Sequence, residues 1–232
     1  MTSFVLALAG FILIHVGVSA TGLRARLAGA VGEGPYRGLF SLASAAFLVW
    51  LVIAYGALRA DPLEPLNGSF YEIPSWGRYA AQGLMLVAFL LGFTGLLTPS
   101  PTLVGFEGQL NKPEPAQGVL RITRHPFLWS VALWACAHLL ANGERAAVML
   151  FAGIGLMALL GTRSIDRKGA ARNPEGWAAF AAVTSNVPFA AIVQGRNRLA
   201  PGEMGWRLAA ALVAYLAVAW AHGAVFGVQA VP

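Results

Sequence analysis

The segment ITRHPFLWSVALWACAHLLANG, residues 122–143, contains an apolar run long enough to cross a bilayer, with a histidine near each end. Thr123 suits the N-cap of a helix, and Pro126 suits its first turn, where the missing N–H costs least. The Asn-Gly pair that closes the segment predicts a left-handed stop. Twenty residues at about 1.5 Å each cover roughly 30 Å, one hydrocarbon core. We therefore predict a transmembrane helix over residues 123–142.

The whole chain shares this apolar character. Of its 232 residues, 57% are hydrophobic and 11% are charged, and the mean hydropathy is +0.65. Soluble domains average about 25% charged residues, so this composition indicates an integral membrane protein. Five more segments are apolar enough to span, namely residues 3–20, 39–58, 79–97, 146–160 and 206–226. We predict an all-α integral membrane protein, a single polytopic domain over residues 1–232 with six transmembrane helices.

The basic residues predict the orientation of these helices. Thirteen Lys and Arg fall in or beside the first, third and fifth connections, and three fall in the second and fourth. The thirteen are Arg24, Arg26, Arg37, Lys112, Arg121, Arg124, Arg163, Arg167, Lys168, Arg172, Arg196, Arg198 and Arg207. By the positive-inside rule the odd connections are cytoplasmic and both termini lie outside, in the inner (cytoplasmic) membrane. Membrane topology accounts for the net charge of +6, so we expect no nucleic-acid partner.

Two connections are long. Residues 99–121, rich in Pro, Gly and Gln, predict an irregular cytoplasmic cover. Within 162–203, the stretch NPEGWAAFAAVTSNVPF places Trp177 and Phe180 three residues apart, on one helical face. This favours a cytoplasmic interfacial helix that rests on lipid, with a lid over a cytoplasmic pocket as the alternative.

All four histidines lie in or beside predicted spans. His15 stands within a span, where an ionisable residue is a functional candidate; the alternative is a neutral imidazole bonded to a neighbouring backbone. His222 lies near the outer end of the last span and is expected to be interfacial. His125 and His138 are thirteen residues apart, about 20 Å along a helix, so they cannot share one metal ion.

The residues around these histidines narrow the kinds of metal or cofactor site that they could form. No zinc-type spacing is present, and no carboxylate lies in a span core. Two lone histidines on separate helices, with Trp134 nearby, favour the axial pair of a flat macrocycle over a clustered metal site. Arg121 and Arg124 are spaced i, i+3 and could bind carboxylates or a phosphate, or could be ordinary cytoplasmic anchors.

Three stretches resemble the NnrU family of membrane proteins, which includes the plant 15-cis-zeta-carotene isomerases. They are TRHPFLWSVALWACAHLLANG, HVGVSATGLRARL and YRGLFSLASAAFLVWLVIAY. The resemblance implies haem b and redox-gated cis–trans isomerisation of a polyene, or a role in nitrite and nitric oxide metabolism. It implies a hydrophobic substrate that enters from lipid.

Site roles follow from the same resemblance, residue by residue. His15 and His138 would be the iron ligands, with Arg121, Arg124 and Trp134 available to the cofactor. Arg124 and the nearby His125 would be the catalytic candidates. On straight helices the heights of His15 and His138 differ by about 11 Å, whereas His222 matches the height of His138 best.

Two alternatives remain open. TRHPFLWS also resembles the RHP box of membrane methyltransferases such as the isoprenylcysteine carboxyl type, which bind S-adenosylmethionine on the cytoplasmic side. Arg124, His125, Asp166 and Trp177 would then surround the cofactor, although Asp166 stands where those enzymes have two glutamates. The other alternative is a non-enzymatic haem carrier or assembly factor. The oligomeric state does not follow from the sequence.

Overall fold

The protein is a bundle of helices in the computed structural model, which describes residues 1–19 and 21–230. Helices are the regular elements of this described part, and one isolated antiparallel bridge joins Ser69 to Glu144. The longer elements, in chain order, are α1 (Thr2–Leu13) continued by the π-helix η1 (Ile14–Val18), α2 (Leu23–Val31), α3 (Glu33–Ala60), α4 (Gly77–Leu96), α5 (Pro126–Ala141), α6 (Arg145–Arg172), α7 (Pro174–Val183) and α9 (Trp206–Phe226). The short ones are η2 (Pro65–Asn67), η3 (Glu107–Asn111), η4 (Gly118–Arg121), α8 (Ala190–Val193) and η5 (Pro201–Glu203).

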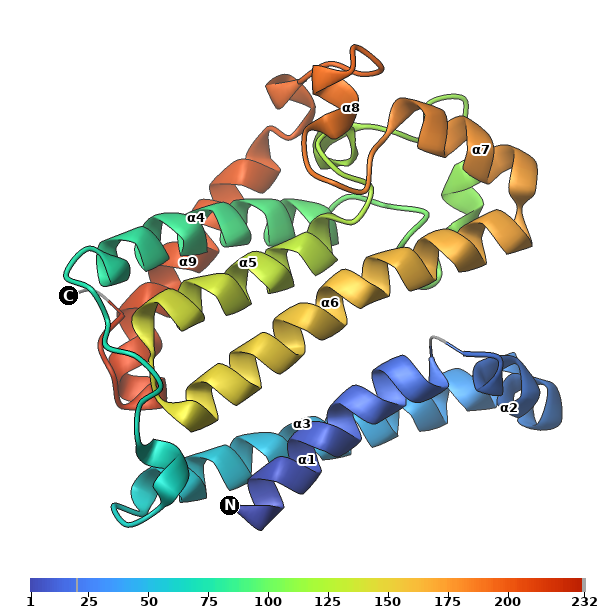
Figure 1. Ribbon diagram of the computed structural model, residues 1–232. Helices are drawn as coiled ribbons and strands as arrows, with labels where there is room; N and C mark the ends of the chain where they lie inside the picture. Colours follow the sequence, from blue (N-terminus) through green and yellow to red (C-terminus); the bar gives the residue numbers. More distant parts are fainter. Residues whose placement is uncertain (20, 231–232) are drawn as a thin grey trace.

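Helices α4, α5 and α6 lie side by side in one layer (Figure 1). Helix α9 packs on α4, and the α1–α3 pair lies beyond α6 (Figure 1). Four helices, α3, α4, α6 and α9, are long and apolar enough to cross a membrane, or up to five if α1–η1 and α2, bent by 82°, count as one span. Helix α5 has 16 residues, about 24 Å. These helices agree with a helical membrane protein, while the number of six spans stays a prediction.

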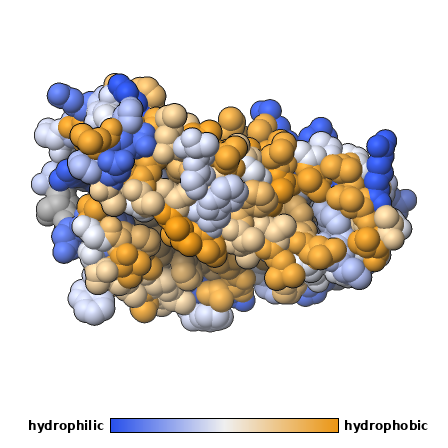
Figure 2. Space-filling model, turned by 90° about the horizontal axis from the view of Figure 1, so that it is seen from below, coloured by the Kyte–Doolittle hydropathy of each residue, from blue (hydrophilic) through white to orange (hydrophobic). Residues whose placement is uncertain are grey.

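The outer helices present apolar side chains to their surroundings. Only 11% of the most apolar window of α3 and 6% of that of α9 are buried inside the protein. Ile53 on α3 and Trp220 on α9 are 65% and 88% exposed. Figure 2 shows a face whose middle is mostly apolar, with hydrophilic residues gathered toward both ends. Such a belt is what a bilayer core stabilises.

The basic connections lie together. Arg37 and Arg172 both pair with Glu107, which links the first, third and fifth connections at one end of the bundle. We call this the basic end. At the opposite end the Met1 amino group pairs with Glu64, and Arg59 pairs with Glu144. The charge segregation read from the sequence is therefore present in the fold, and the compartment that each end faces stays a prediction.

Several predicted boundaries are corrected. The first predicted span ends at Ala20, which lies outside the described residues. Helix α6 is longer than the predicted fifth span, 146–160: it runs on to Arg172, because the first strong helix-breaking signal after that span is the Asn173-Pro174 pair. Its last two turns lie at the basic end and carry polar residues that pair with other segments.

Both ends of α5 also differ from the prediction. The helix begins at Pro126, and His125 rather than Thr123 precedes it, with φ −123° and ψ 55°, because a residue before proline avoids the helical region. The stop is not left-handed. Asn142 is extended, and Gly143 is required because a Cβ there would overlap the carbonyl oxygen of Tyr71.

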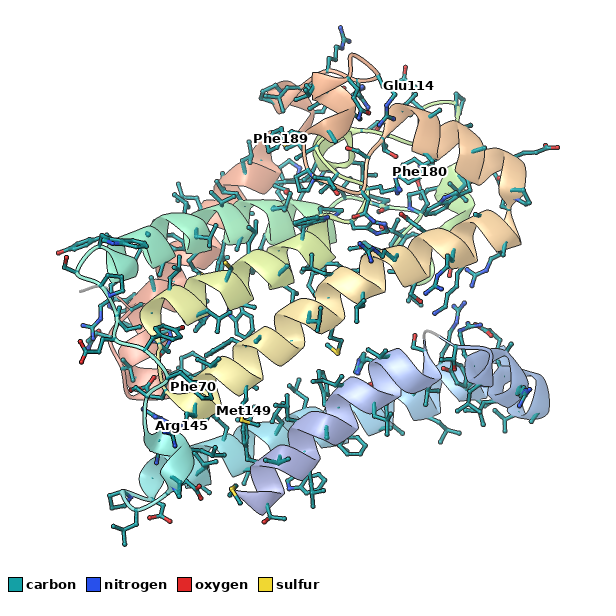
Figure 3. The ribbon with its side chains drawn as sticks, viewed as in Figure 1. Phe70, Glu114, Arg145, Met149, Phe180 and Phe189 are labelled. Carbon is teal, nitrogen blue, oxygen red and sulfur yellow. The ribbon has the colours of Figure 1, made fainter. Side chains whose placement is uncertain are left out.

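The predicted interfacial helix exists as α7, but its aromatic face is not free to rest on lipid. Trp177 and Phe180 are 6% and 0% exposed and pack around Ala116, with Ile165 of α6 beside them. Phe180 lies between α7 and α6 (Figure 3). Gly169 makes room for Trp177, because a Cβ on Gly169 would overlap the indole ring. Helix α7 thus covers the basic end of α6.

Candidate functional site

The Arg-His-Pro corner forms a buried polar network at the basic end. Asp166, on α6, accepts two hydrogen bonds from Arg124, Nε to Oδ1 at 2.8 Å and Nη2 to Oδ2 at 2.6 Å. It also accepts one from Nε2 of His125 at 2.6 Å and one from Nδ2 of Asn186 at 3.1 Å. The network therefore joins the start of α5, the end of α6 and the loop after α7.

Burial favours the neutral form of His125 in this network. Its side chain is fully buried, and burial lowers the pKa of the imidazole below its ordinary value, against the opposing effect of the hydrogen bond that the ring donates to Asp166. A neutral ring that donates Nε2–H to Asp166 leaves Nδ1 as a lone pair. Within the described residues this Nδ1 has no hydrogen-bond partner. The two predicted catalytic residues, His125 and Arg124, are thus brought together and are both bonded to Asp166.

The network also bears on the methyltransferase alternative. Arg124, His125 and Asp166 do meet, as that resemblance implies. Their polar atoms bond one another, however, and Trp177 does not join them, because it packs with Phe180 and Ala116. Nothing in this arrangement favours a bound S-adenosylmethionine.

Arg121 belongs to a different cluster. Its guanidinium donates to both carboxylate oxygens of Glu203 at 2.8 Å and to Oδ1 of Asn197 at 2.9 Å. The hydrogen bonds from Arg121 hold the pKa of Glu203 below its usual range. A shallow cavity of about 280 Å³ beside this pair is also lined by Arg196 and Arg198. Arg121 and Arg124 therefore do not form one anion site.

His138 sits in an aromatic cluster near the opposite end of α5. Its ring stacks on Phe151 of α6 with centroids 4.3 Å apart and contacts Trp134 at 4.6 Å. Nδ1 donates to the carbonyl oxygen of Trp134 at 2.9 Å. This bond fixes the tautomer and leaves Nε2 as the free lone pair, the usual arrangement of a histidine ligand. The structure thus brings together two predicted cofactor residues, Trp134 and His138.

His15 has the same chemistry in another place. Nδ1 donates to the carbonyl oxygen of Phe11 at 2.8 Å, and the ring contacts Phe11 and Phe40 at 4.5 and 5.4 Å. It lies in the π-helical segment η1, a distortion that is frequent at functional sites. Each histidine alone therefore fits an axial ligand.

Helix α6 lies between the two helices that carry His15 and His138 (Figure 1). His138 packs on Phe151 of α6, whereas Ile12, one turn before His15, packs on Gly153. Positions 151 and 153 point about 200° apart on a helix, so α5 and α1 flank opposite faces of α6.

His222, expected to be interfacial, lies in the last two turns of α9. Its Nδ1 donates to the carbonyl oxygen of Val228 at 2.6 Å. Among residues 1–19 and 21–230, no three His, Cys, Asp or Glu side chains cluster to hold a metal ion.

An apolar groove of about 170 Å³ lies between α4 and α5, and the sequence analysis did not identify it. It is lined by α4 from Ala88 to Leu96 and by α5 from Phe127 to Trp134. Only the spacing of small and aromatic residues on the two segments could have signalled it. Through Trp134, the groove reaches the aromatic cluster of His138.

Comparison with known proteins identifies the family of the chain. Residues 3–230 match the model of the family described as NnrU protein. The chain is 28% identical over 197 residues to the chloroplastic 15-cis-zeta-carotene isomerase of Zea mays, and 28% identical over 196 residues to that of Arabidopsis thaliana. Each alignment covers 82% of this chain, and the chain spans about half (50%) of the length of these relatives. No solved structure matches it. The chain belongs to the NnrU family.

Proposed function

We propose that the protein is a membrane isomerase that converts a cis double bond of a hydrophobic polyene to trans. The observation that carries this proposal is the similarity to two plant 15-cis-zeta-carotene isomerases over 82% of the chain. The apolar groove that ends at the His138 cluster supports it, because a polyene dissolves in the bilayer and needs an apolar site.

The reaction needs no leaving group and no net proton transfer, because a cis–trans isomerisation only rotates one carbon–carbon bond. The protein must hold the chain on both sides of that bond and lower its double-bond order at the transition state. Trp134, which lines the groove, is the residue we assign beside the reacting bond, and His138, whose ring contacts Trp134, is the residue we assign to the cofactor.

Haem b is the cofactor we assign to this chemistry, with His138 as one ligand. A bound haem would supply a redox-active iron. His15 would meet the same iron only after α1 moved relative to α6, so no step is assigned to His15. We further assign the basic end to the cytoplasmic side of the membrane.

The test is isomer conversion by purified protein in nanodiscs, supplied with 15-cis-zeta-carotene under reducing conditions and followed by chromatography. We expect conversion by the wild type, loss of conversion and of any haem absorption band in His138→Ala, and retention of both in the lipid-facing control Val52→Ala. A haem-containing wild type that converts no polyene would contradict the isomerase proposal and favour the carrier. A converting protein without haem would remove the cofactor from the proposal.

A further inference from the structure

Close backbone contacts between α4 and α5 lie at the base of the groove, because Gly92 and Ser130, which approach each other most closely, also line it. A Cβ on Gly92 would lie 2.5 Å from the Ser130 hydroxyl oxygen, and one on Gly95 would lie 2.8 Å from Cβ of Pro126. These two glycines therefore set the backbone approach of the two helices. The larger residues beside them, Phe93 and Phe127, stand apart as the walls of the groove.

The lining selects an apolar, flat ligand. Its one hydroxyl, that of Ser130, donates to the carbonyl oxygen of Phe127 at 2.7 Å and so is already paired. The indole N–H of Trp134 is the other polar side-chain group of the lining, so a polar ligand would lose most of its hydration there for few hydrogen bonds. Phe89 and Phe93 both line the groove, with nearly parallel rings whose centroids are 5.4 Å apart at an 11° interplanar angle. Conjugated molecules pack well on such faces.

The size and ends of the groove define how a ligand would lie. Its volume of about 170 Å³ is below the roughly 300 Å³ of small drug-like sites, so it holds a segment of a long chain rather than a whole molecule. At one end Leu96 and Phe127 are 50% and 39% exposed toward the surroundings of the helices. At the other end Trp134 contacts the ring of His138.

We propose that this groove binds the polyene, with the chain entering from lipid past Leu96 and its cis bond lying at Trp134 and His138. This inference rests on the proposed function and adds the location of the substrate. The flat aromatic wall and the continuity with the His138 cluster favour a conjugated chain over a saturated lipid chain.

The experiment measures binding apart from turnover. An achiral polyene acquires circular dichroism in its own absorption band when a protein holds it in one twisted geometry. Purified protein in nanodiscs of a saturated phospholipid is titrated with 15-cis-zeta-carotene, and the induced signal gives Kd. Leu96→Trp fills the mouth of the groove at a half-exposed position, so the fold should tolerate it. The matched control is Leu156→Trp, 60% exposed on α6 and outside the groove.

We expect Leu96→Trp to weaken binding about tenfold or more and the control to stay within about twofold of wild type. Phe93→Ala, which removes half of the stacked wall, should weaken the signal as well. Two results would overturn the proposal that the groove binds the polyene: a wild-type Kd in Leu96→Trp, or a saturated hydrocarbon of the same carbon skeleton that competes as well as the polyene itself. Turnover is assayed in parallel, so that the two proposals can fail separately. Conversion with an unchanged KM in Leu96→Trp would refute only the proposal that the groove binds the substrate. Binding that depends on the groove, without conversion, would refute only the proposed isomerase activity.

Discussion

Replacing Asp166 by asparagine should destabilise the protein strongly, because the carboxylate accepts four hydrogen bonds from three segments. An asparagine has one oxygen, so whichever way the amide turns, two donors face an NH₂ group. Arg124, whose side chain is 14% exposed, also loses its counter-charge. Removing one partner of a buried pair costs about 3–5 kcal/mol. Since Asp166 is 20% exposed and water relieves part of this, we expect about 2–4 kcal/mol.

The assay is the free energy of unfolding in mixed micelles at neutral pH, with increasing fractions of a denaturing detergent. The matched control is Glu33→Gln, which removes a carboxylate that is 45% exposed and pairs with Arg37 at 3.0 Å and with Arg24. Exposed pairs contribute up to about 1 kcal/mol each, so the control should lose clearly less than Asp166→Asn. A loss in Asp166→Asn no larger than that of the control would show that a largely buried ion pair does not hold the Arg-His-Pro corner.

Three further outcomes follow from the structure. Arg121 lowers the pKa of Glu203 below its ordinary value of 4.5, so the pair stabilises the fold above about pH 4.5 and loses this effect as the pH falls through the lowered pKa. The difference in free energy of unfolding between wild type and Glu203→Gln should therefore shrink on acidification. A constant difference from pH 7 to 3 would contradict this prediction. Gly143→Ala should lower the free energy of unfolding by more than about 2 kcal/mol, because its Cβ would overlap the Tyr71 backbone. The control Gly29→Ala has open space around its Cβ in α2, so it should leave the free energy of unfolding unchanged or raise it by up to about 1 kcal/mol. Gly169→Leu should displace Trp177 and expose α7 to protease, which limited proteolysis would detect; an unchanged cleavage pattern would show that α7 does not depend on this contact.

The helical membrane character and the gathering of basic residues at one end could be predicted from the sequence alone. Both depend on the average hydropathy of long segments and on charges placed between them, and neither needs knowledge of which helices touch. The family could also be recognised from the sequence, by the motifs in residues 123–143 and around His15. The match over residues 3–230 confirms it.

Which side chains meet depends on how the helices pack, and that could not be predicted from the sequence. Arg124 and Asp166 lie 42 residues apart, and their pairing depends on how α5 and α6 are rotated and how far α6 extends past its apolar part. The pairing of His15 with His138 on one iron stays a prediction: height along a helix can be counted from sequence, but the face a helix turns to its neighbours cannot. The groove between α4 and α5 is likewise a product of two glycines meeting Ser130 and Pro126 across the helix interface. Periodicity gives a helix its faces, whereas packing against other helices decides which of those faces are joined.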